Sequence, residues 1–208
     1  MKMLKLYLFL LLTFVINITA AENSTPKILM MGDSLSAGYG IDLQQGWVSL
    51  LQEDITFKNH WRIINASVSG ETSTGGRERL PALLKQHQPQ IVLLELGGND
   101  GLRGQPLKIL RDNMQNMIDA SKAAGAKVIL AGMQIPPNYG ARYARQFQNL
   151  YVELAEKNDA ALIPFLLAGI ADNKALMQND GIHPTAEAQP MIVQNVMPTL
   201  KEMLQKNK

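Results

Sequence analysis

The stretch KILMMGDSLSAGYG, residues 27–40, joins an unbroken apolar run to a glycine-rich polar turn. An apolar run without alternation is typical of a strand that is buried on both faces. Four similar runs follow, so that with residues 27–31 the chain has five predicted strands, the others being 61–66, 91–96, 127–132 and 161–165. Strands of this kind favour a buried parallel sheet.

Segments with helical spacing separate the predicted strands or follow them. They span residues 46–53, 77–87, 106–124, 141–158 and 187–205. In the third segment, a stripe at three- and four-residue spacing consists of Leu110, Met114, Met117, Ile118 and Ser121. We interpret its methionines as core packing, not as cofactor contacts. The alternation predicts an α/β fold, a three-layer α/β/α sandwich with a five-stranded parallel sheet, in which ligands bind beyond the carboxyl ends of the strands.

The composition is that of an ordinary globular protein. The 208 residues suffice for one domain with a sizeable core, and 46% are apolar and 18% charged. The chain has no cysteine, which excludes disulfides, a thiol nucleophile and a thiolate zinc site. Without Lys2 and Lys5, which lie in a segment expected to be removed, 18 basic residues balance 18 acidic ones. No basic patch for nucleic acid is visible.

The first residues have the layout of a secretory signal peptide. Two lysines precede an apolar run over residues 6–16, and small residues follow at Ala20 and Ala21. The run is shorter than the ~20 residues that a membrane-spanning helix needs. We predict a signal peptide over residues 1–21, cut after Ala20 or, preferably, Ala21. The remainder, 22–208, is then a single domain that is periplasmic or secreted, without stable membrane insertion.

Polar, glycine-containing segments follow the first three predicted strands, and a fourth precedes the last helix. They span residues 32–40, 67–72, 97–101 and 180–185. An acyl-transfer enzyme needs a nucleophile, a base, a group that orients the base, and donors for the oxyanion. Ser34, directly past the first strand, is the candidate nucleophile. Because His60 and His87 lie in segments that look like surface loop or helix ends, His183 is the candidate base.

Asp180 lies three residues before His183 in a tight segment that contains a glycine. At that spacing its carboxylate can reach one ring nitrogen while the other faces Ser34, which would fix the tautomer and stabilise the imidazolium. The candidate oxyanion donors are the backbone N–H groups of Ser34 and Gly70 and the side-chain amide of Asn99. Each feature has a plainer alternative: a serine that caps a helix, an asparagine that forms a turn, or a solvated Asp-His pair.

Two acidic residues near the candidate nucleophile need separate treatment. Asp33 either tunes the electrostatics of the site or braces the loop at a helix start. Glu95 lies within an apolar strand, where an unpaired carboxylate would be costly. We therefore expect Glu95 to have a structural partner and to take no part in catalysis.

Four blocks of the sequence, in this order, resemble the hallmarks of the SGNH (GDSL) hydrolases: Gly32-Asp33-Ser34-Leu35-Ser36, Gly70, Gly97-x-Asn99-Asp100 and Asp180-x-x-His183. The resemblance implies the flavodoxin-like SGNH hydrolase fold. It implies that Ser34 is the nucleophile and that Asp180 and His183 complete a catalytic triad. It also implies that Gly70 and Asn99 complete the oxyanion hole.

Within that family, the chain resembles the bacterial TesA-type acyl-CoA thioesterases, also described as protease I and lysophospholipase. The likeness extends over about residues 28–203. It implies that the loop around residues 101–106 borders an acyl-chain groove and moves when substrate binds.

The implied reaction is a two-step acyl transfer from a carboxylic ester or thioester through an acyl-enzyme on Ser34, with no metal or organic cofactor. The apolar residues expected to line the acyl pocket are Leu35, Leu102, Ile135 and Pro136. The expected substrates are small acyl esters, thioesters and lysophospholipids, and the expected state is a monomer that binds no nucleic acid. One alternative is a carbohydrate acetylesterase of the same superfamily. The other is a flavodoxin-like protein that binds an anion or nucleotide at the turn 32–40.

Overall fold

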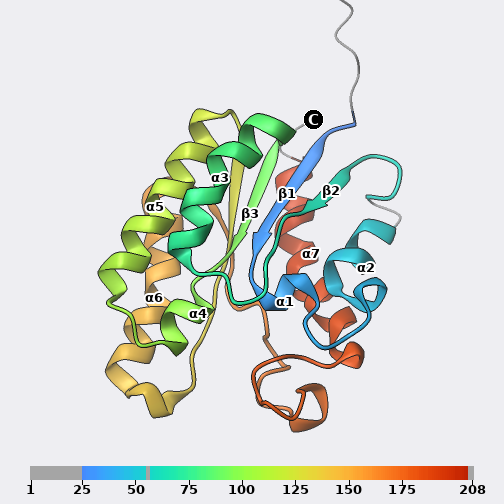
Figure 1. Ribbon diagram of the computed structural model, residues 1–208. Helices are drawn as coiled ribbons and strands as arrows, with labels where there is room; N and C mark the ends of the chain where they lie inside the picture. The colour runs from blue at the N-terminus through green and yellow to red at the C-terminus, as the bar shows by residue number, and fades with distance from the viewer. Residues whose placement is uncertain (1–24, 55–56, 206–208) are drawn as a thin grey trace, which may run out of the picture.

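A five-stranded parallel sheet forms the middle layer of the computed structural model, which describes residues 25–54 and 57–205. The strands lie in the order β2-β1-β3-β4-β5 (Figure 1). Their bounds are Lys27–Gly32 for β1, Arg62–Asn65 for β2, Ile91–Glu95 for β3, Lys127–Ala131 for β4 and Ala161–Ile163 for β5. The predicted α/β fold with five parallel strands is confirmed. The predicted signal peptide, residues 1–21, lies outside the described residues.

The strand order reverses direction at β1. The chain first adds β2 on one side of β1 and then crosses over to place β3 on the other side. In the β1–β3 pairing, Ile28 lies opposite Ile91 and Gly32 opposite Glu95. An open parallel sheet binds its ligands beyond the carboxyl ends of the strands at such a switch point. The segments that follow Gly32 and Glu95 therefore occupy the position where a site is expected.

The described part of the chain contains seven α-helices. Their bounds are α1 Ser34–Ala37, α2 Trp47–Glu53, α3 Ser73–His87, α4 Gly98–Leu102, α5 Leu107–Ala123, α6 Ala141–Asn158 and α7 Gln189–Gln205. Four short 3₁₀ turns accompany them: η1 Leu43–Gln45, η2 Pro137–Tyr139, η3 Lys174–Leu176 and η4 Ala186–Ala188. Figure 1 shows α3, α5 and α6 on one face of the sheet and α2 and α7 on the other. Among the described helices, none combines the length and the apolarity needed to cross a bilayer.

The helix starts differ from the sequence prediction by more than one residue at two places. The helix predicted from residue 77 begins at Ser73, because the Thr72 hydroxyl accepts a hydrogen bond from the Gly75 N–H and caps it. The helix predicted from residue 187 begins at Gln189, after the 3₁₀ turn η4.

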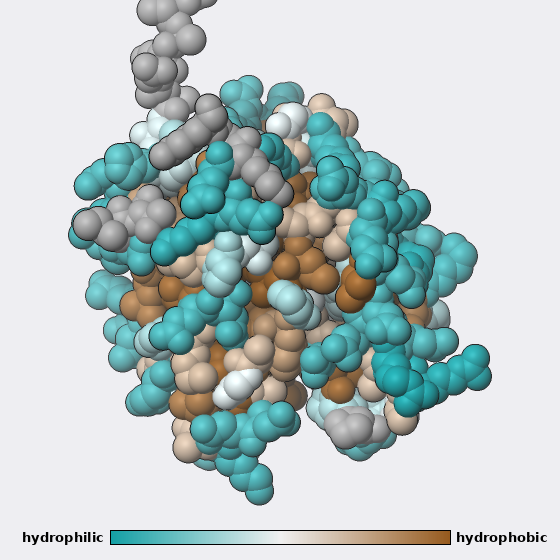
Figure 2. Space-filling model, turned by 180° about the vertical axis from the view of Figure 1, so that it is seen from behind, coloured by the Kyte–Doolittle hydropathy of each residue, from teal (hydrophilic) through white to brown (hydrophobic). Residues whose placement is uncertain are grey.

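Each of the central strands contributes alternate side chains to two separate cores, which explains their unbroken apolarity. Leu29 and Met31 of β1 pack toward α3, α5 and α6, whereas Ile28 and Met30 pack toward α2 and α7. These four side chains are fully buried. Seen from behind, the molecule carries hydrophilic side chains over much of its surface, and apolar ones show between them in the middle of the face (Figure 2).

Candidate functional site

The predicted nucleophile and base are hydrogen-bonded to each other although 149 positions separate them in the sequence. Ser34 is the first residue of α1, directly after β1 and Asp33. Its Oγ lies 2.8 Å from Nε2 of His183, and Nδ1 of His183 lies 2.6 Å from Oδ2 of Asp180. The three predicted residues thus form one continuous relay.

The Asp180–His183 turn is held by its own backbone. Oδ1 of Asp180 accepts hydrogen bonds from the backbone N–H groups of Ile182 and His183 at 2.9 and 3.0 Å. Desolvation opposes ionisation of Asp180, but the hydrogen bonds from the backbone and ring of His183 and from Ile182 outweigh it. Together they lower the pKa of Asp180 to about 2. Asp180 is therefore a carboxylate at neutral pH and an acceptor for Nδ1–H.

Two neighbours contact His183 from outside the turn, one at its ring and one at its backbone. The Tyr39 ring lies with its centroid 4.5 Å from that of His183, tilted by 38°. Gln178 donates its side-chain amide to the carbonyls of Tyr39 and Pro184, and its backbone N–H to the carbonyl of His183. The segment from Met177 to Pro184 is closed by an antiparallel bridge between these two residues. The ring thus packs against Tyr39, to which Gln178 links the turn.

The predicted oxyanion donors differ in their hydrogen bonding. The backbone N–H groups of Ser34 and Gly70 have no acceptor among the described residues, and Gly70 adopts a φ of 79°, a conformation suited to glycine. Nδ2 of Asn99 donates to the backbone carbonyl of Glu71 at 2.9 Å and to Oδ2 of Asp33 at 3.2 Å. Two N–H groups are therefore free for a ligand, and the amide of Asn99 is held beside the Gly70 segment.

Two polar networks that the sequence analysis missed brace these donors. Asp100 is buried and accepts from the backbone N–H and the hydroxyl of Ser73 at 2.8 and 2.6 Å, which ties the start of α3 to α4. Arg79 pairs with Glu71 at 2.6 Å and donates to the carbonyl of Ala66. In the sequence, Glu71 and Arg79 are merely two oppositely charged residues eight positions apart, and this spacing does not predict an ion pair beside Gly70.

An apolar pocket of about 370 Å³ opens beside Ser34. All four residues predicted to line it do so, namely Leu35, Leu102, Ile135 and Pro136. The sequence analysis missed further apolar lining residues in the segments after β4 and β5: Met133, Phe165, Leu166, Leu167 and Met177. The one sequence feature that could have identified these residues is their position after predicted strands. The pocket can receive an apolar chain whose polar end lies at Ser34.

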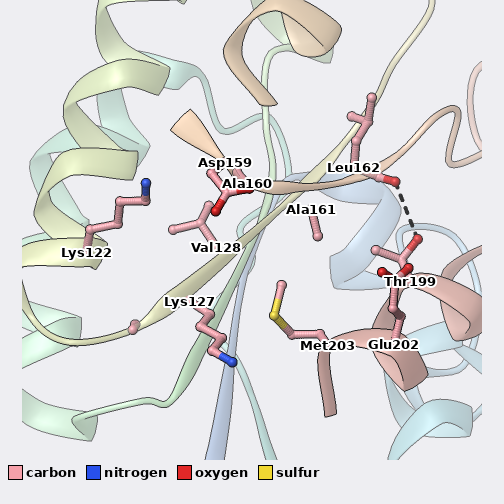
Figure 3. Close-up of a pocket in the computed structure, with 11 residues that line it drawn as sticks. Lys122, Lys127, Val128, Asp159, Ala160, Ala161, Leu162, Thr199, Glu202 and Met203 are labelled. Atoms are coloured by element: carbon pink, nitrogen blue, oxygen red, sulfur yellow. Dashed lines mark hydrogen bonds between the residues drawn. The ribbon is translucent and has the colours of Figure 1, made fainter. Parts of the chain in front are cut away.

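A second cavity, of about 540 Å³, lies beside the amino ends of β4 and β5, away from the carboxyl ends that carry the Ser34 site (Figure 3). Lys127, Asp159 and Thr199 are among its lining residues, and Thr199 donates to the carbonyl of Leu162. It is larger than the pocket at Ser34, but neither a nucleophile–histidine pair nor a histidine of any kind lines it. His60 is exposed, and His87 lies at the end of α3, so neither reaches the Ser34 site.

Comparison with known proteins gives a consistent result. The model of the GDSL-like Lipase/Acylhydrolase family matches residues 30–189. Esterase TesA of Pseudomonas aeruginosa is 47% identical over 184 residues, which cover 88% of this chain and 92% of that protein. Thioesterase 1/protease 1/lysophospholipase L1 of Escherichia coli K12 is 42% identical over 179 residues, covering 86% and 85%.

One of the similar solved structures is that of a psychrotrophic esterase, EstA, from Pseudoalteromonas sp., inhibited by monoethylphosphonate. It superposes with a TM-score of 0.82 at 44% identity, covering 86% of this chain and 98% of that one.

Proposed function

Because this chain belongs to the GDSL-like lipase/acylhydrolase family, we propose that it is an exported serine hydrolase that cleaves carboxylic esters and thioesters through an acyl-enzyme on Ser34. The observation that carries the proposal is the relay at the site. Oγ of Ser34 lies 2.8 Å from Nε2 of His183, whose Nδ1 lies 2.6 Å from the Asp180 carboxylate. A nucleophile, its base and the group that orients the base are then in hydrogen-bond contact before any substrate binds.

The state of the ring follows from its partners. Ionised Asp180 can only accept, so the imidazole carries its proton on Nδ1 and leaves the Nε2 lone pair facing Ser34. As Oγ attacks the acyl carbon, its proton passes to Nε2. The C–O or C–S bond of the tetrahedral intermediate then breaks while the imidazolium returns this proton to the leaving group. Water repeats both steps and releases the carboxylic acid.

The oxyanion of that intermediate needs donors that are present before it forms. The N–H groups of Ser34 and Gly70 meet this requirement because no acceptor from residues 25–54 or 57–205 occupies them. The amide of Asn99 joins them by exchanging one of its two protein acceptors for the oxyanion. Losing one such donor costs about 3 kcal/mol of transition-state stabilisation.

The pocket supports an acyl chain as the group that enters beside Ser34. Its 370 Å³ lies near the lower end of the range for small-molecule sites, about 300–1,000 Å³. Its apolar lining favours fatty acyl esters, thioesters and lysophospholipids, the substrates that the names of the relatives suggest, over the polar groove of a sugar acetylesterase. We expect the enzyme to act as a monomer in the periplasm or outside the cell.

The anion-binding alternative is disfavoured by Asp33. Its carboxylate already accepts from the N–H of Leu35 at the start of α1, so the position an anion would take at this helix start holds a carboxylate. The helix is also only four residues long.

The test is hydrolysis of p-nitrophenyl esters from acetyl to long acyl chains by residues 22–208, with Ser34→Ala as the matched control. We expect activity on medium chains that the substitution abolishes. A phosphonate ester should add one phosphonyl group to the wild type and none to Ser34→Ala, as measured by intact-protein mass spectrometry. Activity limited to acetyl esters would favour the sugar esterase, and activity that survives the substitution would reject Ser34 as the nucleophile.

A further inference from the structure

Two carboxyl groups are buried together directly behind Ser34. Asp33 is 2% exposed, and Glu95 is fully buried. Oε2 of Glu95 accepts from the hydroxyl of Ser36 at 2.6 Å and from the backbone N–H of Asp33 at 3.1 Å. The pairing of β1 with β3 allows this approach only because residue 32 is glycine. A Cβ on Gly32 would lie 2.4 Å from Oε2 of Glu95.

The other oxygen of Glu95, Oε1, is buried and has no hydrogen-bond donor among the described residues. An ionised carboxylate in that position would hold part of its charge in an unsatisfied, dry site, which is costly. A protonated carboxyl group lowers this cost, since it places no charge in the dry site. The geometry of Glu95 is therefore that of a neutral acid.

The hydrogen-bond partners of Asp33 suit an ionised carboxylate, in contrast to those of Glu95. Its Oδ1 accepts from the N–H of Leu35 at 3.0 Å, and its Oδ2 accepts from Nδ2 of Asn99 at 3.2 Å. Both are donors that prefer an ionised acceptor. We infer that Asp33 and Glu95 share a single proton, held by Glu95, and that the resulting charge on Asp33 positions the Asn99 amide and stabilises the imidazolium of His183.

The electrostatics agree with this assignment. Burial raises the pKa of Glu95 well above its usual range, and the nearby charge of Asp33 raises it further. Burial also raises the pKa of Asp33, to about 6, against the hydrogen bonds from Leu35, Glu95 and Asn99 and the charge of His183, which lower it. At pH 7 to 8, one carboxyl of the pair is protonated and the other ionised, as expected for two acids in one dry site.

Among the described residues, the ionisable groups around the pair are His183, whose charge lowers the pKa of Asp33, Asp100, which is buried and accepts from Ser73, and Tyr151. From α1, Ser36 faces Glu95 as a neutral donor, and from α6 the buried Tyr151 hydroxyl donates to the carbonyl of Leu96. Burial and the carboxyl groups of Asp100, Glu95 and Asp33 raise the pKa of Tyr151 well above its usual range, so it stays neutral. Below pH 6, the pair takes up a second proton. Oδ2 of Asp33 can then no longer serve Asn99 as a fixed acceptor.

Both residues act through others, as positioning residues. The inference rests on the proposed function, because it concerns the amide and the imidazole that the reaction uses. The inference predicts that substitutions of the two residues have unequal effects. Glu95→Gln keeps a neutral side chain with an N–H donor and an oxygen acceptor, whereas Asp33→Asn removes the charge.

The test measures kcat and KM for a p-nitrophenyl ester at pH 8 in both variants. We expect kcat to fall about threefold in Glu95→Gln and at least about thirtyfold in Asp33→Asn, with KM unchanged within about twofold, since the charge acts on the transition state. The matched control is Asp42→Asn. Asp42 also caps a helical turn by accepting from the N–H two residues on, but no described carboxyl group is bonded to it, and kcat should not change.

A second readout does not depend on activity. Infrared spectra at pH 8 should show the C=O band of one protonated carboxyl group in the wild type. This band should disappear in Glu95→Gln and persist in Ser34→Ala and Asp42→Asn. Absence of the band in the wild type, or Glu95→Gln as slow as Asp33→Asn, would overturn the shared proton. An inactive wild type with the band present would instead reject the proposed function alone.

Discussion

Replacing Asp180 with asparagine separates the two tasks that its oxygens perform. Oδ1 accepts from the N–H groups of Ile182 and His183, and Oδ2 lies 2.6 Å from Nδ1 of the ring. An asparagine can keep Oδ1 as the acceptor for the turn while it presents an N–H group to the ring. Nδ1 must then accept, which moves the ring proton to Nε2, where it faces Ser34.

With its proton on Nε2, His183 cannot accept a proton from Ser34. In a Ser-His-Asp arrangement, this tautomer change costs about 10⁴ in kcat, or about 5.4 kcal/mol of activation free energy. We expect kcat of Asp180→Asn to fall by about 10³ to 10⁴ and KM to stay within about threefold, because the apolar pocket is untouched.

The effect on stability should be much smaller than the effect on rate. Although desolvation opposes it, the hydrogen bonds to Asp180 lower its pKa from 3.8 to about 2. At about 1.36 kcal/mol per unit, this is about 2.4 kcal/mol, which solvent reduces to about 1 kcal/mol because the side chain is 39% exposed. Since the folded pKa is lowered, this stabilisation is complete above pH 3.8 and is lost as the pH falls through about 2.

The assay is release of p-nitrophenol from a butyrate ester at pH 8, together with thermal unfolding at pH 7. Asp180→Ala is the matched control, because it removes Oδ1 as well. We expect it to be equally slow but to unfold at a lower temperature than Asp180→Asn. If Asp180→Asn kept more than about a tenth of the wild-type kcat, the tautomer argument would be wrong.

Three further predictions follow from the same structure. Gly70→Ala places a Cβ in open space but at a φ of 79°, so the free energy of unfolding should fall by about 1–2 kcal/mol. The value of kcat should fall at least about tenfold, and an unchanged kcat would exclude the Gly70 N–H as an oxyanion donor. Met133→Trp fills part of the pocket and should lower kcat/KM for an octanoyl ester at least about tenfold, against less than about threefold for the acetyl ester; equal losses would place the acyl chain elsewhere. Burial raises the pKa of Asp33 from 3.8 to about 6, so the folded state binds the extra proton in that window. Through Asp33, the free energy of unfolding should therefore fall by about 2 kcal/mol as the pH rises from 4 to 6. Urea titrations at both pH values should show a larger fall in the wild type than in Asp33→Asn, in which only the raised pKa of Glu95 still contributes.

The strands were predictable because each is buried on both faces, which leaves an unbroken apolar run. The start of α3 could not be predicted from the sequence. Gly75 and Gly76 lie in its first turn and are poor helix formers, which pointed to a later start. What stabilises that turn is the cap by Thr72 and the carboxylate of Asp100, which accepts from Ser73 across 27 positions. Local propensity cannot report a partner so distant.

The site was predictable to the extent that its residues follow strands. Ser34 and Asn99 come after β1 and β3, and the parallel sheet brings these ends together at one edge. The pocket residues that the sequence did not predict, such as Phe165 and Leu167, lie in the long connection between β5 and α7, which has only short 3₁₀ turns. Its path over the pocket depends on tertiary contacts, for example that of the Asn195 amide with the carbonyl of Leu166. Periodicity carries no information about such a path.

Glu95 connects the fold to the site. The sequence required a partner for it but could not name one, because the partner depends on the pairing that sets Gly32 opposite Glu95. A slip of β3 by one residue would turn its side chains to the other face and send this carboxyl group into an apolar core. The hydrogen bonds of Glu95 to Ser36 and Asp33 are lost in every such alternative. The same buried acid that we infer to hold the proton thus also favours the one register in which Asp33 and Asn99 lie beside Ser34.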